Sequence, residues 1–438
     1  MDKPKLDLSA YLARLETAVP ARVHGRVREV TGLVIHATVP RVTVGEMVEI
    51  EGTSGSLLAQ VVGFRDERVV LMPLGDIVGV GPNSTVKTMG EPLTLRCGPG
   101  LLGRVLDGLG RPIDGQGPIE GELHAWKVER PAPPAITRRR ISAPFETGIR
   151  AIDGLMTVGE GQRIGLFAGS GVGKSTLMGQ IARSARADVV VIGLVGERGR
   201  ELRDFIEENL GPGGLERTVV VCATSDETSL MRRGAAMVAT AVAEYFRDQG
   251  QRVLMMMDSL TRFARAQREI GLAAGEPPVR RGYPPSVFRL LPRLLERTGN
   301  NDRGSITALY TVLVEGDDMD EPIADEVRAI LDGHIVLDRA IAERAHWPAV
   351  HVNASISRVM GRVVTQDHMR AANAFRRTLA AYESKRTLIG LGAYRRGSDP
   401  QVDEALDLIE EMEEFLQQPT DERCPMDDTL ELLLDLFG

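Results

Sequence analysis

The stretch Ala168-Gly-Ser-Gly-Val-Gly-Lys-Ser-Thr176 decides the fold of this chain. The apolar run 164–167 before it predicts a buried strand, and residues 177–183 after it have helical spacing. This order of strand, glycine-rich turn and helix is the context of a phosphate-binding loop. Glycines let successive backbone N–H groups turn toward one anion, and the helix N-terminus adds its positive dipole. Position 168 is alanine where that motif usually begins with glycine.

The side chains of the loop predict a site for nucleotide phosphates. Lys174 can reach the β- and γ-phosphates, and the hydroxyl of Ser175 can ligate Mg²⁺. A glycine-rich turn without a ligand would not account for Gly-Lys-Ser at its end. The residues expected to bind the nucleotide here are Gly169, Ser170, Gly171, Val172, Gly173, Lys174, Ser175 and Thr176.

Two acidic residues at predicted strand ends are further candidates. Asp258 ends the apolar run 252–257, where it can hold the water shell of Mg²⁺ or cap the following helix. Glu197 follows the run 191–194, where it can act as a general base on water or interact with a helix dipole. The residues themselves leave both alternatives open for Glu197.

The alternation of apolar runs and helical patterns from about residue 149 to 337 predicts an α/β fold with a mainly parallel sheet. Ligands of such sheets bind at the C-terminal strand ends, where the candidate residues fall. The expected strands are 164–168, 189–195, 218–223, 253–258 and 305–312.

The rest of the chain predicts three further kinds of structure. Helical spacing within 6–18 indicates a short amphipathic helix, and short β-rich runs after it indicate a small β-barrel. The glycine- and proline-rich segment 93–148 predicts an irregular connection with little helix. Strong helix formers predict C-terminal helices at 366–391, 400–417 and 427–437. The predicted regions are 1–20 (helix), 21–92 (barrel), 93–345 (nucleotide-binding domain) and 346–438 (helical domain).

Composition argues against several classes of protein. The chain of 438 residues has a net charge of −8, and its predicted barrel lacks an aromatic row and a basic cluster, which disfavours a nucleic-acid-binding surface. Cys97, Cys222 and Cys424 lie far apart without metal-ligand spacing, so we expect small buried thiols. A polar N-terminus and the absence of a long apolar stretch predict a cytoplasmic protein.

Together these motifs resemble the rotary ATPase family, which comprises the catalytic subunits of ATP synthases and the ATPases of flagellar and type III protein export. The similarity runs from about residue 23 to the end, and Pro348-Ala-Val-His-Val-Asn-Ala-Ser-Ile-Ser357 is similar to the family signature. The tail segments 392–399 and 414–418 are more similar to the flagellar export ATPase than to the injectisome enzyme. The stretches that resemble the export branch are 165–175, 258–269, 282–288 and 310–318.

The resemblance implies roles for single residues. Lys174 and Ser175 would bind phosphate and Mg²⁺, and Asp258 would be the acid of the Mg²⁺ shell. Glu197 would position the attacking water, and Arg198 would contact the γ-phosphate.

Three more roles come from the same resemblance. Arg358 would be a finger given to the next subunit, although a surface ion pair is the usual interpretation of such an arginine. Trp347 would stack on adenine, and Tyr394 would close the other side of the base.

We therefore expect a homohexamer that hydrolyses Mg–ATP and energises protein export through a flagellar-type apparatus, unfolding substrates or releasing them from chaperones. The expected partners are a central stalk protein near residues 366–394, a regulatory or stator protein, substrates and chaperones. Nucleic acid is not expected as a partner, and we expect the protein to contact the membrane only peripherally, through the export gate. The alternatives are an injectisome ATPase, a rotary ATP synthase subunit and a ring-shaped nucleic-acid translocase. Glu197 favours a catalytic chain, because non-catalytic subunits of the resembled family typically carry Gln there.

Overall fold

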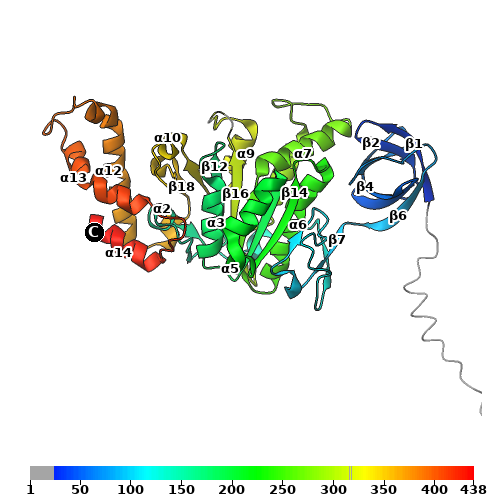
Figure 1. Ribbon diagram of the computed structural model, residues 1–438, viewed down its shortest axis with the longest axis horizontal. Coiled ribbons are helices and arrows are strands. Elements are labelled where there is room, and N and C mark those ends of the chain that lie inside the picture. Colours follow the sequence, from blue (N-terminus) through cyan, green and yellow to red (C-terminus); the bar gives the residue numbers. More distant parts are fainter. Residues whose placement is uncertain (1–23, 315, 317) are drawn as a thin grey trace, which may run out of the picture. The chain divides into compact units, whose positions relative to one another are not determined.

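The computed structural model describes residues 24–314, 316 and 318–438. The chain forms two compact units, one ending at Leu93 and the other running from Thr94 to Gly438 (Figure 1). The predicted helix within 6–18 lies outside the described residues. The four region limits given above stay predictions, and the C-terminal helices belong to the same compact unit as the parallel sheet.

The first unit is a closed antiparallel barrel with strand order β1-β2-β5-β4-β3-β6. Pairing of His24 with Lys87 closes it between the first and last strands. Ile35, Ile50 and Leu71 fill its interior and are fully buried. The predicted barrel is confirmed, but its last strand has no apolar run, because polar and glycine residues occupy most of it. The strands are β1 (His24–Thr31), β2 (Val34–Thr38), β3 (Glu46–Gly52), β4 (Gly55–Arg65), β5 (Arg68–Pro73) and β6 (Thr85–Pro92).

The second unit is built on a sheet with strand order β18-β17-β12-β16-β15-β13-β14-β8, parallel except for β18. The predicted parallel sheet and its five expected strands are confirmed. The segment 93–148 has little helix, as expected, but it is less irregular than expected, because it holds four short strands. One of them is β8, where Val105 pairs with Val220 and extends the sheet edge. The strands are β8 (Val105–Leu106), β12 (Arg163–Ala168), β13 (Val189–Glu197), β14 (Thr218–Thr224), β15 (Arg252–Asp258), β16 (Ser305–Leu313), β17 (Gly333–Leu337) and β18 (Ile356–Ser357).

Short strand pairs and helices complete this unit. Helix α3 begins directly at Lys174, so the phosphate-loop motif runs from strand into helix as predicted. The two small pairs are β7 (Thr94–Cys97) with β9 (His124–Lys127) and β10 (Pro144–Phe145) with β11 (Val158–Gly159). The helices before the C-terminal region are α2 (Arg150–Leu155), α3 (Lys174–Ser184), α4 (Gly199–Asp204), α5 (Gly211–Leu215), α6 (Ser229–Asp248), α7 (Leu260–Ala273), α8 (Pro285–Leu295), α9 (Pro322–Ile330), α10 (Arg339–Ala342) and α11 (Met360–Val363), with a π-helix at Phe205–Leu210.

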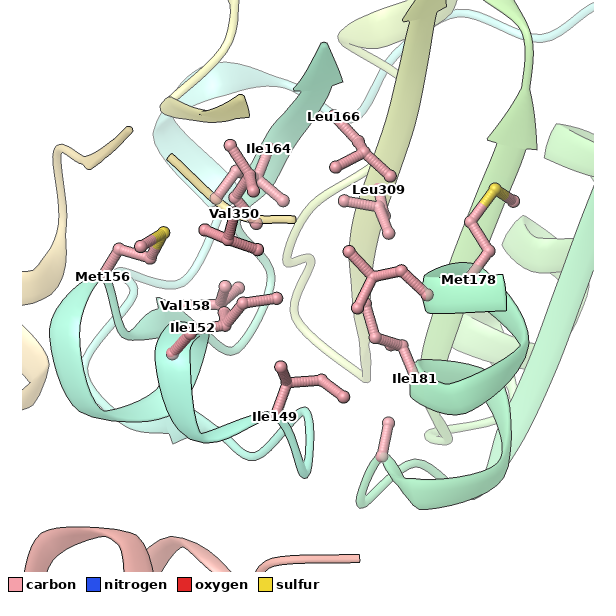
Figure 2. Packing of buried hydrophobic residues seen from close by; sticks show 14 of the residues in the cluster. Ile149, Ile152, Met156, Val158, Ile164, Leu166, Met178, Ile181, Leu309 and Val350 are labelled. Carbon is pink, nitrogen blue, oxygen red and sulfur yellow. The ribbon is translucent and has the colours of Figure 1, made fainter. Parts of the chain in front are cut away.

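Helices α2 and α3 share one core with the sheet. Figure 2 shows Ile152 of α2 and Ile181 of α3 in one cluster with Ile164 and Leu309 of neighbouring strands. Each of these side chains is at most 4% exposed. Burial of one such side chain stabilises the fold by about 1.5–3 kcal/mol, so both helices are fixed firmly in this core.

The C-terminal helices pack onto α2. They are α12 (Gln366–Gly390), α13 (Pro400–Leu416) and α14 (Met426–Phe437), within one residue of the predicted limits. The ring centroid of Phe375 lies 5.4 Å from that of Phe415 and 5.5 Å from that of Phe437. A Cβ atom at Gly154 would lie 2.8 Å from the Phe415 ring, so only glycine lets α2 approach this closely.

Two expectations drawn from composition can be compared with the described residues. Cys97, Cys222 and Cys424 are buried and unpaired, and burial raises the pKa of the Cys97 and Cys222 thiols to about 12. None of the described helices is both long and apolar enough to cross a bilayer.

Candidate active site

A cavity of about 940 Å³ lies where β12, β13 and β16 reach their C-terminal ends. This is the sheet edge at which the sequence predicts ligand binding. Most predicted residues lie along it, whereas Val172, Asp258, Arg358 and Tyr394 do not. The predicted residues that line the cavity are Gly169, Ser170, Gly171, Gly173, Lys174, Ser175, Thr176, Glu197, Arg198 and Trp347.

The loop before α3 has the backbone of an anion cradle. Gly171 and Gly173 have φ values of +79° and +82°, the left-handed region that side chains rarely adopt. Val172 between them is 2% exposed and anchors the loop in the core. A Cβ atom on Gly173 would lie 2.7 Å from Cζ3 of Trp347, so the loop and this ring are in close contact.

Lys174 and Asp258 meet at the floor of the site. Lys174 Nζ donates to Asp258 Oδ1 at 2.5 Å, and Thr311 donates to the same oxygen at 2.7 Å. The Asp258 side chain is 4% exposed, so its negative charge is held by these donors. Ser259, not Asp258, caps α7 by accepting a hydrogen bond from the backbone of Arg262.

These residues also fit the needs of Mg²⁺. Magnesium prefers oxygen ligands and is usually held by one or two protein groups together with substrate phosphates. Ser175 lies along the cavity, and the Asp258 carboxylate contacts Lys174, which also lines it. Within the described residues no group of three or more His, Cys, Asp or Glu forms a metal cage. The donor set therefore fits a metal that arrives with the nucleotide.

Glu197 ends β13 between two cations. Its Oε1 lies 3.9 Å from Lys174 Nζ and 3.0 Å from Arg262 Nε, while Arg262 Nη2 donates to Oε2 at 3.2 Å. Oε1 is buried, and no well-aligned donor in the described chain reaches it, although Arg262 Nε lies nearby. Burial, and then the charge of Asp258, raises the pKa of Glu197 to about 7, against the opposing effect of Lys174 and Arg262.

This raised pKa predicts the pH dependence of hydrolysis. Glu197 can accept a proton only when ionised, so kcat/KM is expected to rise with pH through about 7 and then level off. Replacement of Arg262 by Gln removes a cation and should move the rising limb to higher pH. Initial rates across pH 5.5–9, roughly, on both proteins test this. A rate that is already level across this range would contradict it, because Glu197 would then titrate at its ordinary pKa of about 4.3.

The two predicted arginines differ in position. The Arg198 side chain is 78% exposed, lines the cavity and pairs with Glu201 at 3.2 Å. Arg358 is exposed and does not line this cavity; its Nη2 donates to Arg328 O at 3.3 Å. The structure therefore does not bring Arg358 to the Lys174 of its own chain. The role of Arg358 as a finger at the site of a neighbouring subunit stays a prediction.

The side of the cavity that is predicted to hold the base departs from expectation. Trp347 lines it and is 40% exposed, as a stacking platform must be. Tyr394 lies beyond the far end of α12, and its hydroxyl donates to Asp399 O and Asp403 Oδ1, each at 3.0 Å. The 25 residues of α12 span about 38 Å, which carries Tyr394 away from the cavity. Gln418 and Thr420 line the cavity instead.

Several residues that line the cavity were not predicted from the sequence. Arg262 had a usable signal, since it lies about one helical turn after Asp258 in the same strand-to-helix motif. Arg265 follows Arg262 on α7, and Gln180 lies on α3, while the remaining residues lie in segments far from these motifs and had no signal. The missed residues are Gln180, Arg262, Arg265, Arg339, Gln418 and Thr420.

Comparison with known proteins places this geometry in a family. The model of the ATP synthase alpha/beta family, nucleotide-binding domain, matches residues 148–357, and that of its beta-barrel domain matches residues 27–90. A type 3 secretion system ATPase from Xanthomonas euvesicatoria is 55% identical over 96% of this chain and 95% of its own. The chain belongs to the ATP synthase alpha/beta family.

Within the ATP synthase alpha/beta family, the export enzymes are similar over nearly the whole chain. The model of the T3SS EscN ATPase C-terminal domain matches residues 364–435. A flagellum-specific ATP synthase from Bacillus subtilis is 53% identical, with 95% of each chain covered. The assembled EscN ATPase of enteropathogenic E. coli, solved with its central stalk EscO, has a TM-score of 0.88 at 45% identity, covering 94% of this chain and 100% of that one. This family member is an ATPase.

Proposed function

We propose that the chain is the subunit of a homohexameric ATPase that energises protein export through a type III apparatus. The observation that carries the proposal is that Lys174 and Glu197 line one cavity, with Asp258 in contact with Lys174 and Arg358 outside the cavity. One chain would therefore supply the phosphate, metal and water-activating groups, while its Arg358 lies away from its own site. A ring of identical subunits would complete every site at its boundaries.

In this site each residue has a separate task. Lys174 neutralises the β- and γ-phosphates, and the backbone of the cradle donates to their oxygens. The Glu197 carboxylate orients a water toward the γ-phosphorus and takes its proton. Arg198 contacts the γ-phosphate from the exposed rim. Because the carboxylate already lies among cations, little reorganisation is needed when charge moves.

Bound Mg²⁺ would neutralise negative charge on the phosphate oxygens. Ser175 and Asp258 are the residues that would hold it, Ser175 through its hydroxyl and Asp258 through the water shell. Lys174 now occupies Asp258 Oδ1, so nucleotide binding would exchange this contact for phosphate contacts. The salt bridge between Lys174 and Asp258 would therefore be replaced when a nucleotide binds.

The C-terminal helices are the proposed contact for a central stalk. EscN is solved with such a stalk, and this chain shares its fold. The end of α12 exposes apolar and basic side chains together, with Leu388 44% and Leu391 75% exposed. Arg395, in the turn that follows, is also exposed. A coiled-coil stalk with apolar and acidic positions would fit this end of the helix.

We further propose a cytoplasmic protein that reaches the membrane only through the export gate and works with a regulatory or stator protein, substrates and their chaperones. The tail segments favour the flagellar system. The 55% identity to a type 3 secretion ATPase favours the injectisome alternative. Stimulation of hydrolysis by a flagellar stalk protein, and not by an injectisome stalk protein, would support the flagellar assignment.

Assembly-dependent activity is the central test. Specific ATPase activity is expected to rise steeply with protein concentration, because a dilute monomer lacks the trans finger. Hydrolysis and sedimentation measured on the same dilution series would show both rising together. Constant specific activity from monomer to assembled protein would overturn the shared-site proposal.

A further inference from the structure

The segment that joins α13 to α14, residues 417–423, is bound along its backbone by other parts of the unit; we call it the strap. Gln418 N–H donates to Trp347 O at 2.9 Å. Gln180 and Arg183, both on α3, donate to Pro419 O at 2.9 Å and to Thr420 O at 2.7 Å. The strap thus connects the helix behind the phosphate loop with the ring proposed to stack on the base.

Arg150 on α2 is the main holder of the strap. It is 9% exposed, and its Nη2 donates to Gln417 O at 2.5 Å while Nη1 pairs with Glu422. Its Nε donates to Phe415 O at 3.1 Å, and its backbone N–H donates to Gln418 Oε1 at 2.9 Å. A guanidinium this buried needs all of these partners, so the strap and α2 have one favoured arrangement.

The strap forms part of the cavity wall on the side of Trp347. Gln418 and Thr420 both line the cavity. The Gln418 side chain is 3% exposed, and its amide donates to Gly148 O at 2.8 Å while accepting from Arg150. Its amide is therefore occupied, and it fixes the wall. Arg150 does not line the cavity.

We infer that Arg150 is a positioning residue, which acts through the strap on the wall of the cavity beside Trp347 and so on the place of the base. This inference rests on the proposed function, since it takes Trp347 as the base platform. Loss of Arg150 would release Gln417 and Glu422, and the wall at Gln418 and Thr420 would loosen. The phosphate side would keep its contacts, because Lys174 and Asp258 bind neither Arg150 nor the strap.

Loss of Arg150 should therefore weaken the binding of ligands that carry a base, and not of ligands that consist of phosphates alone. Arg150→Met should raise KM for ATP about tenfold, equal to about 1.4 kcal/mol, and leave the inhibition constant of inorganic triphosphate within about twofold. Glu422→Gln keeps the size of its side chain and should give a smaller shift of the same kind, which covers the case that Arg150→Met does not fold.

The matched control is Arg376→Met. Arg376 is another half-buried arginine, which donates to Leu155 O at 2.8 Å and to Val352 O at 2.7 Å but not to the strap. It should leave KM for ATP unchanged. The chain has two tryptophans, so nucleotide titrations in a Trp126→Phe background report on Trp347 alone. Quenching of this signal should need about tenfold more ATP in the Arg150→Met protein.

Two outcomes would overturn the inference. Equal shifts for ATP and inorganic triphosphate would mean that Arg150 supports the whole site and not the base side. A KM shift in Arg376→Met as large as in Arg150→Met would mean that any loosening of the helical region has this effect. A wild-type protein without ATP hydrolysis would instead refute the proposed function, so the two failures are distinct.

Discussion

Glu197→Gln is expected to lower kcat for ATP hydrolysis about 10³-fold while ATP still binds. The amide keeps the shape of the side chain but cannot take a proton from water. It also removes a negative charge beside Lys174 and Arg262, so ATP affinity should stay equal or rise. Steady-state hydrolysis and nucleotide titration of Trp347 fluorescence measure the two effects separately.

Glu201→Gln is the matched control for this experiment. Glu201 also lines the cavity, but it lies on α4 and pairs with Arg198 at the exposed rim. Its loss should change kcat by no more than about threefold, as expected for an exposed ion pair. If Glu197→Gln retained a tenth of the wild-type rate, general-base chemistry at Glu197 would have to be abandoned.

Arg358→Ala is expected to lower kcat about 10³-fold without preventing assembly, because a finger acts on transition-state charge. Arg362→Ala, an exposed arginine on α11, should have little effect. The decisive measurement mixes two inactive proteins. An Arg358→Ala subunit keeps Glu197, and a Glu197→Gln subunit keeps Arg358, so a mixed ring regains complete sites at some boundaries.

The recovered rate depends on the order of subunits in the ring. With random mixing at equal amounts, about a quarter of boundaries should pair an intact Glu197 with an intact Arg358. Activity well above that of either parent would therefore show that the site is shared. A mixture no more active than its parents, at concentrations where both assemble, would assign the arginine to its own chain or to no catalytic role.

Local sequence patterns predicted the phosphate loop and the main strands of the sheet. The apolar strand, the glycine-rich turn and Lys174 are adjacent in sequence, so the phosphate cradle could be placed without knowing the fold. The main strands were equally accessible, since each is a continuous apolar run. β8 was not, because two residues carry no periodicity and its pairing with β14 is long-range.

The base side could not be derived in the same way. Arg150 and Glu422 meet across 272 positions, and the Gln180 contact with Pro419 spans 239. No short-range sequence pattern indicates contacts between residues so far apart in the chain. An aromatic residue was sought opposite Trp347, and Tyr394 was the choice. The structure instead supplies a polar wall whose position depends on a buried arginine.

The closed barrel has a consequence for assembly. Its six strands pair in a cycle, so the described barrel offers no unpaired strand edge to a neighbour. Copies of this barrel can therefore associate only through side-chain surfaces, and not by adding strand to strand. Such contacts can be made and broken without disturbing any backbone hydrogen bond within the barrel. Subunits could therefore join or leave a ring while each barrel stays folded.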